Sequence, residues 1–424
     1  MPSRHRMYGG IMRLIAVLAC ALLLANCSHS SFGVPFSPPL SSGASALRPS
    51  TGGPWLCGQP PSLVRSPETA AQPDNGYRSL YKFKAGKDGG YPYGALVELK
   101  GKLYGTTDQG GKNGFGTVYE VSTTGQERVV YSFVGDKDVG YPCSRLIVVN
   151  GKLYGTAQSG GLHGWGGVFE VTTSGSERLV HSFKANSDGA APYGGVLYLK
   201  GKFYGTTVEG GSKGWGTVYE TSATGQERVL YTFKAGKDGG YPYGDLTLVN
   251  GTLYGTTKEG GSTGWGTVFS CTLAGKETVL YSFKAGNDGA YPYDGLTYLD
   301  HKLFGTTKEG GRAGFGVVFS IDLSRQEHIL YSFKSGSDGG YPYARLTAVN
   351  GALYGTTVEG NSANWGTVFR VTTTGKEQVL YSFKAGHDGA YPFGQLIFLN
   401  GRLYGTTQGG GVNGGWGTVF SILP

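Results

Sequence analysis

The chain has 424 residues, of which 77 are glycine and 29 are tyrosine, and it carries a net charge of +8. Few charged residues and no long run of helix formers favour an all-β protein. The positive charge favours anionic partners in general, although an export signal at the N-terminus argues against nucleic acid. The five cysteines are too few and too scattered for a disulfide framework, and we expect Cys143 and Cys271 to be small buried side chains.

Residues 1–27 have the organisation of a bacterial export signal. Three arginines within the first 13 residues precede a short apolar run, 14–25, which is too short to span a membrane as a mature helix. The run ends at Asn26-Cys27, which is similar to a lipobox, in which the cysteine becomes the acylated N-terminus. Several acyl chains on Cys27 would tether the protein stably to a membrane. Because Asn26 replaces the usual small residue, ordinary secretion is the alternative.

The residues after Cys27 predict where the protein is sorted and how it is held. Ser28 follows the cysteine where an aspartate would favour the inner membrane, so we expect an outer-membrane lipoprotein, or otherwise a secreted or periplasmic protein. Residues 28–76 contain nine of the chain's eighteen prolines, together with much serine, glycine and alanine. Such a segment cannot bury enough apolar surface to offset its ordering entropy, which predicts an extended, disordered tether.

From residue 77 to the C-terminus the sequence repeats every fifty residues. The core Tyr-Gly-Thr-Thr, changed by one residue in two copies, begins at positions 104, 154, 204, 254, 304, 354 and 404. A fixed period of this length is typical of a solenoid, a propeller or an array. We therefore treat residues 77–424 as one domain built from seven units.

Each unit contains four short runs of the β type. The first two runs are joined by a Lys-Gly or Asn-Gly turn, such as Asn150-Gly151, which is the strongest short signal of a hairpin. A second tight turn joins the third and fourth runs, so that each unit is a four-stranded antiparallel meander. Seven such sheets around an axis form a β-propeller. The runs in the first unit are Ala95–Leu99, Lys102–Thr107, Thr117–Ser122 and Arg128–Phe133.

The frame of the repeat predicts how the ring closes. The last unit stops after its third strand, at Gly417–Leu423, and a segment like the missing fourth strand occurs at the other end of the domain, at residues 78–83. A closed ring needs its ends joined, because it otherwise leaves exposed strand edges. We therefore predict that residues 78–83 pair with the C-terminal strand and complete the seventh blade.

An aromatic residue recurs at one position of every unit and an aspartate at another. We interpret the aromatic residues as plugs between blades, with a ligand-stacking ring as the alternative. We interpret the aspartates as turn formers that accept hydrogen bonds from backbone N–H groups, with calcium binding as the alternative. Gly105 and its equivalents are expected to make room where neighbouring sheets approach near the axis. The two sets are Phe115, Trp165, Trp215, Trp265, Phe315, Trp365 and Trp416, and Asp88, Asp138, Asp188, Asp238, Asp288, Asp338 and Asp388.

Two long loops in each unit, one before the first strand and one between the second and third, are expected at the same end of the propeller. Loops on a rigid scaffold carry function, so we place a binding site on this face, near the axis. The loop sequence K-A-G-x-D-G-x-Y-P-Y brings lysines such as Lys84 and Lys234 together with tyrosines such as Tyr91 and Tyr241. This combination suits an acidic polysaccharide or stacked sugars, and a solvated rim without a ligand is the alternative.

Differences between the units are more informative about function than the repeat, because a symmetric scaffold needs no asymmetry. Four polar residues at one position before the first strand, Arg145, Asp245, Arg345 and Gln395, are candidates for an asymmetric pocket at the mouth of the channel, with drift as the alternative. The five histidines of the repeats occupy five different positions and give neither metal-ligand spacing nor a catalytic set. We expect no metal and no cofactor.

The core L-Y-G-T-T-x-x-G-G-x-x-G-x-G-T-V-F is followed by a strand ending in S-F and then by D-G-x-x-P. This pattern resembles the GloVer-type choice-of-anchor tandem repeat in all seven units, over residues 77–424. The resemblance implies an extracytoplasmic propeller whose anchoring signal varies between members, and the lipobox-like leader fits that description. The resemblance assigns no catalytic residue.

Two classes of function remain open, besides a purely structural role in the envelope. The first is a monomeric, membrane-tethered binding or scaffold module whose partner is a glycan or an envelope protein. The second is an extracytoplasmic polysaccharide lyase or hydrolase with its site at the channel mouth. An enzyme requires acid and base groups that converge, such as Asp245 with Arg145 or Arg345.

Overall fold

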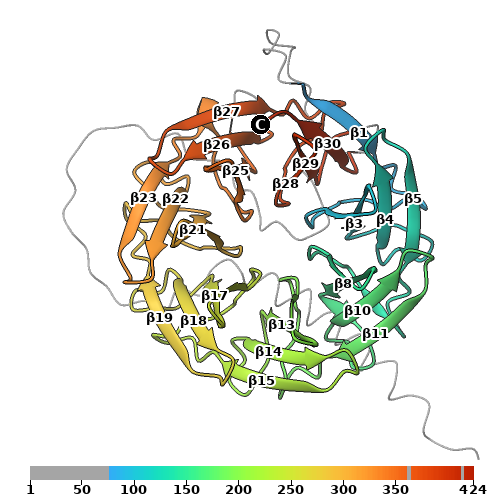
Figure 1. Cartoon of the computed structure of the whole chain (residues 1–424), viewed down its shortest axis with the longest axis horizontal. Helices are drawn as coiled ribbons and strands as arrows, with labels where there is room; N and C mark the ends of the chain where they lie inside the picture. Colours follow the sequence, from blue (N-terminus) through green and yellow to red (C-terminus); the bar gives the residue numbers. More distant parts are fainter. Residues whose placement is uncertain (1–75, 361–363, 412–414) are drawn as a thin grey trace, which may run out of the picture. The chain divides into compact units, whose positions relative to one another are not determined.

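The computed structural model describes residues 76–360, 364–411 and 415–424. Within these residues, seven four-stranded sheets are arranged as blades around a central axis (Figure 1). Every pairing within a blade is antiparallel, which confirms the predicted seven-bladed β-propeller. The predicted leader with Cys27 and the tether up to residue 75 lie outside the described residues.

The first blade shows the construction of all seven. Its strands are β2 (Val97–Leu99), β3 (Lys102–Thr107), β4 (Thr117–Ser122) and β5 (Glu127–Ser132). The strand β2 lies nearest the axis and β5 lies at the outside of the ring (Figure 1). The predicted runs agree with these bounds to within two residues, because alternating apolar residues and tight turns mark both hairpins.

The remaining blades repeat this order. Blade 2 comprises β7 (Ile147–Val149), β8 (Lys152–Ala157), β10 (Gly167–Thr172) and β11 (Glu177–Ser182). Blade 3 comprises β12 (Leu197–Leu199), β13 (Lys202–Thr207), β14 (Thr217–Ser222) and β15 (Glu227–Thr232). Blade 4 comprises β16 (Thr247–Val249), β17 (Thr252–Thr257), β18 (Thr267–Thr272) and β19 (Glu277–Ser282). Blade 5 comprises β20 (Thr297–Leu299), β21 (Lys302–Thr307), β22 (Val317–Asp322) and β23 (Glu327–Ser332); blade 6 comprises β24 (Thr347–Val349), β25 (Ala352–Thr357), β26 (Thr367–Thr372) and β27 (Glu377–Ser382). The short strand β6 (Val139–Gly140) precedes blade 2 and pairs with β9 (Ser159–Gly160), which lies in the loop between β8 and β10. The 3₁₀ turn η1 (Gly336–Asp338) lies in the loop between blades 5 and 6.

The seventh blade joins the two ends of the domain. It contains β28 (Ile397–Leu399), β29 (Arg402–Thr407) and β30 (Thr418–Ile422), and its outer strand is β1 (Arg78–Lys82). The strands β1 and β30 pair antiparallel, which confirms the predicted closure. The ring of Tyr77 also stacks on Tyr381 of the neighbouring blade, with centroids 4.0 Å apart.

Aromatic side chains fill the spaces between the blades. Phe133 at the end of blade 1 is fully buried and its ring meets that of Phe169 in blade 2, with centroids 5.0 Å apart. The interpretation of Gly105 was wrong in its cause. A Cβ atom at Gly105 would lie 2.5 Å from the hydroxyl oxygen of Tyr119, which belongs to the same blade. The glycine therefore makes room for an aromatic ring of its own sheet, not for a neighbouring sheet.

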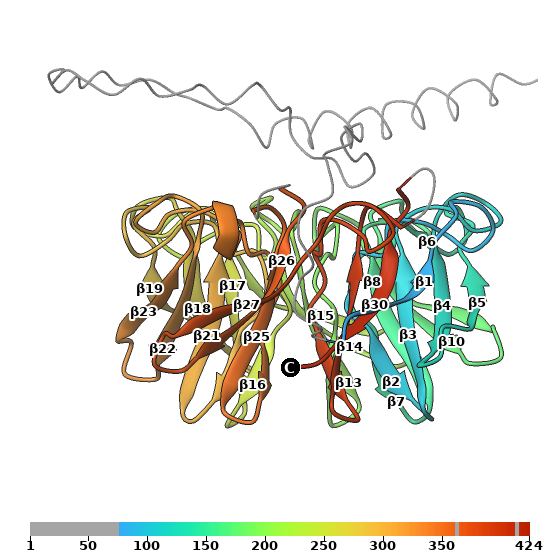
Figure 2. The ribbon, with the colours of Figure 1, turned by 90° about the horizontal axis from the view of Figure 1, so that it is seen from above.

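The long loops gather at one end of the ring and the short turns at the other, as predicted (Figure 2). In blade 1 the two long loops pair, because the Gly90 amide donates to the Gln109 carbonyl at 2.9 Å and the Asp108 amide donates to the Tyr91 carbonyl at 3.0 Å. Among the described residues, no helix has the length and apolar character needed to cross a membrane.

The recurring aspartates and aromatic residues both have structural contacts. The carboxylate of Asp88 accepts hydrogen bonds from the Lys84 amide at 3.0 Å and from the Tyr81 hydroxyl at 2.8 Å, which confirms the predicted turn. Trp416 of blade 7 packs on Tyr91 at the entry to blade 1, with ring centroids 4.9 Å apart. The aromatic residues are therefore plugs between blades.

Candidate ligand-binding site

Six aromatic rings form an arc around the axis at the entry to the blades. They belong to the second aromatic position of the Tyr-Pro-Tyr segments, one in each blade except blade 2, where Cys143 stands instead. Each ring contacts the next, with centroids 4.8–5.3 Å apart. We call this set the aromatic arc: Tyr193, Tyr243, Tyr293, Tyr343, Phe393 and Tyr93.

Close packing between the blades fixes the arc near the axis. Tyr93 precedes the innermost strand of its blade by four residues. Directly after it, a Cβ atom at Gly94 would lie 2.3 Å from the carbonyl oxygen of Ser144 in the next blade. The same carbonyl accepts a hydrogen bond from the Thr106 hydroxyl at 3.2 Å. The backbone that carries the arc is therefore held between neighbouring blades.

Two lysines lie over the faces of the arc. The Lys258 ammonium is 5.9 Å from the centroid of Tyr243 and 5.6 Å from that of Tyr293. The Lys308 ammonium is 5.9 Å from Tyr293 and 5.7 Å from Tyr343. All four distances suit a cation–π interaction. The Lys258 side chain is only 6% exposed, and its ammonium also forms an ion pair with Glu259 at 3.1 Å.

An acidic residue occupies the same loop position in blade 1. Asp108 is 1% exposed, and its Oδ1 accepts a hydrogen bond from Gln158 of blade 2 at 3.3 Å. Its Oδ2 has no hydrogen-bond partner among the described residues. Burial raises the pKa of Asp108 to about 7. One side of the ring thus carries a titratable carboxyl group, and the side of blades 4 and 5 carries two ammonium groups.

A second group of charged residues contains Arg145 and Asp245, which occupy the asymmetric repeat position selected from the sequence. Arg145 of blade 2 forms an ion pair with Asp245 of blade 4, and the amide of Gly195, in the blade between them, donates to the same carboxylate. Asp245 is 7% exposed, so the pair is largely removed from water. The absence of a side chain at Gly195 leaves room for Arg145, whose Cγ would lie 3.2 Å from a Cβ atom there.

Arg345 and Gln395 lie in the same part of the ring. The backbone N–H of Arg345 donates to the carboxylate of Asp294 at 2.8 Å. The side-chain amide of Gln395 donates to the backbone carbonyl of Leu346 at 3.3 Å. Burial, followed by the charge of Arg145, lowers the pKa of Arg345 to about 10. Burial, followed by the charge of Asp245, raises the pKa of Asp294. The predicted residues Arg145, Asp245 and Arg345 are therefore brought together, with Asp294 as a further member.

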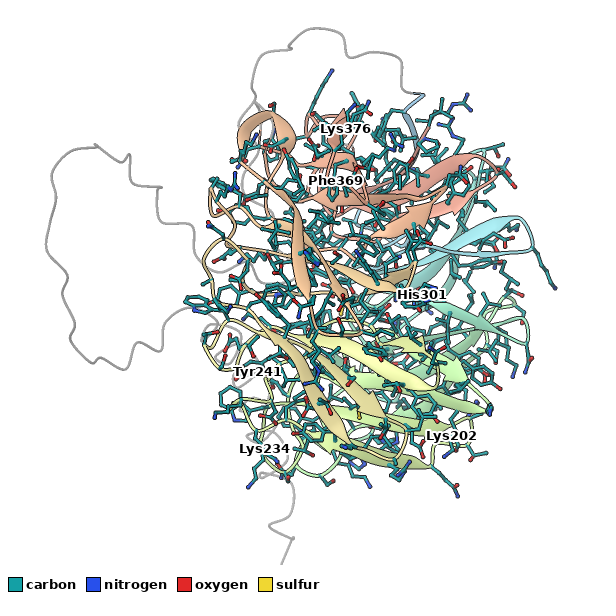
Figure 3. The ribbon with its side chains drawn as sticks, turned by 60° about the vertical axis from the view of Figure 1, so that its left-hand side comes forward. Lys202, Lys234, Tyr241, His301, Phe369 and Lys376 are labelled. Atoms are coloured by element: carbon teal, nitrogen blue, oxygen red, sulfur yellow. The ribbon has the colours of Figure 1, made fainter. Side chains whose placement is uncertain are left out.

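The other predicted residues lie elsewhere. Lys84 and Lys234 follow the outermost strands β1 and β15 and are exposed. The Lys234 ammonium lies over Tyr231 of its own blade, 5.8 Å from the ring centroid, and Figure 3 shows this lysine at the edge of the molecule. Tyr91 and Tyr241 pack between blades, Tyr241 against Trp215 with centroids 4.8 Å apart. These four residues are not brought to the charged group around Arg145.

Several residues of the site were not predicted from the sequence: the aromatic arc, both lysines above it, Asp108 and Asp294. Both tyrosines of the Tyr-Pro-Tyr segment recur in the sequence. Nothing in the sequence indicates that the first tyrosine packs between blades and that the second joins the arc. A signal for Asp108 and for the two lysines was present in the sequence. Comparing the units at the position of Asp108 gives Asp, Gln, Val, Lys, Lys, Val and Gln, which is an asymmetry of the kind used to select Arg145.

The fold and these contacts define a tandem-repeat β-propeller with aromatic and charged side chains before its innermost strands. A family model described as the Gloeobacter/Verrucomicrobia repeat matches residues 70–166, 145–351 and 316–424, and the chain belongs to that family. No curated protein matches the chain.

Solved structures that resemble the chain are distant. A putative 6-phosphogluconolactonase from Bacteroides uniformis is 12% identical with a TM-score of 0.45, covering 67% of this chain and 82% of its own. A lectin from Burkholderia pseudomallei is 12% identical with a TM-score of 0.43, covering 66% of this chain and 80% of its own. A putative gluconolactonase is 12% identical with a TM-score of 0.41, covering 82% and 91%. At this distance these structures say nothing about the activity of the chain.

Proposed function

We propose that the protein is an exported, lipid-tethered binding module that holds an acidic glycan at the entrance formed by the long loops. The observation that carries this proposal is the aromatic arc with Lys258 and Lys308 above its rings. Half-buried aromatic faces suit the apolar faces of sugar rings, and a few fixed polar groups give such a site its orientation. The two ammonium groups would pair with carboxylate or sulfate groups of the glycan.

The tether and the charge of the chain are consistent with this role. The lipobox-like end of the leader would hold the propeller at the outer membrane through Cys27, where envelope or environmental polysaccharides are within reach. The net charge of +8 would raise the local concentration of an anionic polymer. Asp108 lies across the arc from the lysines, and it would set the direction in which an acidic chain is bound.

The proposal is tested by measuring retention of polysaccharides by the full chain in affinity electrophoresis. Polymers of uronic acids and sulfated polymers should retard the protein, and neutral glucans should not. Tyr293→Ala should weaken retention, because Tyr293 faces both lysines, whereas Tyr241→Ala, which changes a tyrosine packed between blades, should leave the retention of correctly folded protein unchanged. Equal retention of neutral and acidic polymers would contradict the proposal.

A polysaccharide lyase or hydrolase is the second candidate, and one observation favours it. Asp294 lies beside the ion pair of Asp245 with Arg145, and burial raises the pKa of Asp294, as a general acid requires. The same screen should therefore also score product release. Retention without products supports the binding module. Products that disappear in Asp294→Asn, with retention unchanged, support the enzyme.

A further inference from the structure

Three residues at equivalent repeat positions meet at six junctions between blades, and five of the six sets have the same residue types. In five junctions a tyrosine at the outer strand donates its hydroxyl to the recurring aspartate at 2.7–2.8 Å, beside a glutamate from the next blade. In the junction between blades 2 and 3 the tyrosine is replaced by His181. The six sets are Tyr81, Asp88 and Glu127; Tyr131, Asp138 and Glu177; His181, Asp188 and Glu227; Tyr231, Asp238 and Glu277; Tyr281, Asp288 and Glu327; Tyr331, Asp338 and Glu377.

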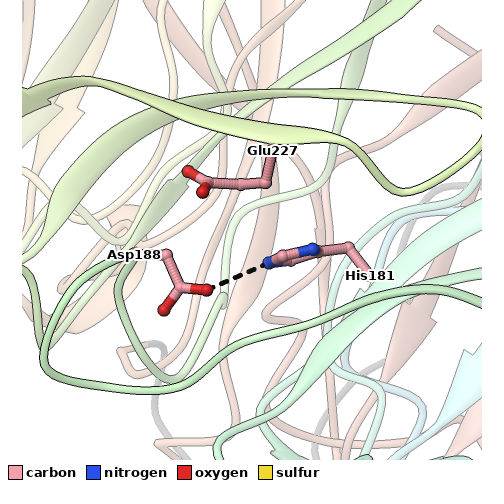
Figure 4. A group of neighbouring side chains, drawn as sticks. All are labelled: His181, Asp188 and Glu227. Atoms are coloured by element: carbon pink, nitrogen blue, oxygen red, sulfur yellow. Dashed lines mark hydrogen bonds and ion pairs between the residues drawn. The ribbon is translucent and has the colours of Figure 1, made fainter.

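We propose that His181, Asp188 and Glu227 bind one divalent transition-metal ion of the zinc class between blades 2 and 3. His181 lies on β11, Asp188 in the loop that follows it, and Glu227 is the first residue of β15. Each residue offers one ligand atom, and these atoms lie within 4.8 Å of one another. Figure 4 shows the edge of the imidazole directed at Asp188, with the carboxyl group of Glu227 above them.

The imidazole is oriented as a metal ligand. Its Nδ1 lies 3.3 Å from the carbonyl oxygen of Gly225, which can only accept a hydrogen bond. In the neutral ring, Nδ1 therefore carries the proton and Nε2 presents its lone pair to the carboxylates. A hydrogen bond from the second ring nitrogen to a backbone carbonyl is the usual support of metal-binding histidines.

The geometry fits the size of a metal ion. Zinc binds nitrogen and oxygen at about 2.0–2.2 Å, so two ligands on one edge of a tetrahedron lie about 3.3 Å apart. The His181 Nε2 atom and the Asp188 Oδ2 atom are 3.3 Å apart. Glu227 supplies the third ligand atom within 4.8 Å of the others, and its Oε1 has no hydrogen-bond partner among the described residues. Water molecules would fill the remaining coordination positions.

The junction places two acidic side chains beside the imidazole. Asp188 is 5% exposed, and its Oδ2 atom faces the Nε2 atom of His181. The nitrogen and oxygen atoms that the three residues offer are zinc ligands, and one divalent cation can be shared among them. Lys184 is near Glu227 but is exposed, so its side chain can turn into solvent.

The choice of metal follows from the donor set. Imidazole suits zinc and its neighbours in the first transition row, whereas calcium takes six to eight oxygen ligands and magnesium keeps most of its water. Linear spacing in the sequence gave no sign of this site, because its three residues lie in two different repeats. The site is at the outside of the ring and is independent of the aromatic arc.

The repeat supplies two matched variants. His181→Tyr restores the residue found at five equivalent junctions, so the variant should fold. Tyr231→His should create a second copy of the site with Asp238 and Glu277 in the next junction. The experiment is titration of the chelator-treated full chain with Zn²⁺ in a calorimeter, with the same titration by Ca²⁺ as a control. Subtracting the stoichiometry measured for His181→Tyr from that of the wild type corrects for zinc bound by residues outside the junction.

The wild type should bind one Zn²⁺ per chain more than His181→Tyr does, and Tyr231→His should bind one more than the wild type. Co²⁺ should give tetrahedral or five-coordinate absorption bands in the same order. Zn²⁺ should raise the melting temperature of the wild type and not that of His181→Tyr. Equal stoichiometry in the wild type and His181→Tyr would overturn the proposal and leave only a structural contact between His181 and Asp188.

Discussion

Truncation of Phe83 tests how the ring is closed. Phe83 follows β1, is fully buried, and meets Tyr119 of blade 1 with ring centroids 5.0 Å apart. Its amide donates to the Gly417 carbonyl at 3.0 Å, as the amide of Phe233 donates to Gly216 in blade 3. If residues 78–83 are the outer strand of blade 7, Phe83→Ala should cost as much as Phe233→Ala. Both should lower the free energy of unfolding by about 3–5 kcal/mol, through lost transfer energy and a cavity.

The assay is guanidinium unfolding of the full chain, followed by circular dichroism and fluorescence. Phe233 provides the matched control, because it is equally buried and meets Phe269 with centroids 5.1 Å apart. A Phe83→Ala variant within about 0.5 kcal/mol of the wild type, beside a Phe233→Ala variant that loses several kcal/mol, would refute closure by β1, since surface substitutions stay within that range. Deletion of residues up to 83 should in addition abolish a single cooperative transition.

Two further predictions concern titratable groups in blade 4, the half-buried Glu277 and the buried Cys271. Burial, followed by the charge of Asp238, raises the pKa of Glu277 from 4.5 to about 7, so the stability it contributes is fully present below about pH 4.5 and is lost as the pH rises through 7. Glu277→Gln should match the wild type in urea at pH 4.5 and exceed it at pH 8, by on the order of 1 kcal/mol because the group is partly exposed; an equal shift at both pH values would contradict this. Burial, followed by Glu277, raises the pKa of the Cys271 thiol to about 12, so Cys271 should resist alkylation at pH 8 until the chain is unfolded, and rapid labelling of the folded protein in peptide mass spectra would contradict its burial.

The sequence predicted the fold because every local signal in the repeat agrees. The Asn-Gly turns, the alternating strands and the shift in the repeat frame all follow from short-range chemistry, and the position of β1 beside β30 follows from the need to pair two edges. The reason for Gly105 was not predictable, because the side chain that fills the space belongs to the facing strand of the same sheet.

The candidate site was predictable only in part. Arg145, Asp245 and Arg345 were found because they break the symmetry of the repeat, and they do lie together. Lys84 and Tyr91 share one loop with Tyr93, yet the loop runs from the outside of the ring to the axis, so the three residues are spread along a radius. A one-dimensional pattern does not contain that radial order. His181 was missed for a similar reason, because its partner Glu227 comes from the next repeat.

The most direct test of glycan binding at the aromatic arc compares two pairs of lysines. The inner pair is Lys258 and Lys308, and the outer pair is Lys234 and Lys284. Lys258→Gln with Lys308→Gln removes two charges above the arc, and Lys234→Gln with Lys284→Gln removes the same number at the outside of the ring, where each lysine lies over a tyrosine of its own blade. Because net charge changes equally, non-specific attraction falls equally. The affinity of the full chain for an acidic oligosaccharide should fall at least about tenfold, or about 1.4 kcal/mol, in the inner pair and less than about twofold in the outer pair. Equal losses in the two pairs would contradict a site at the arc.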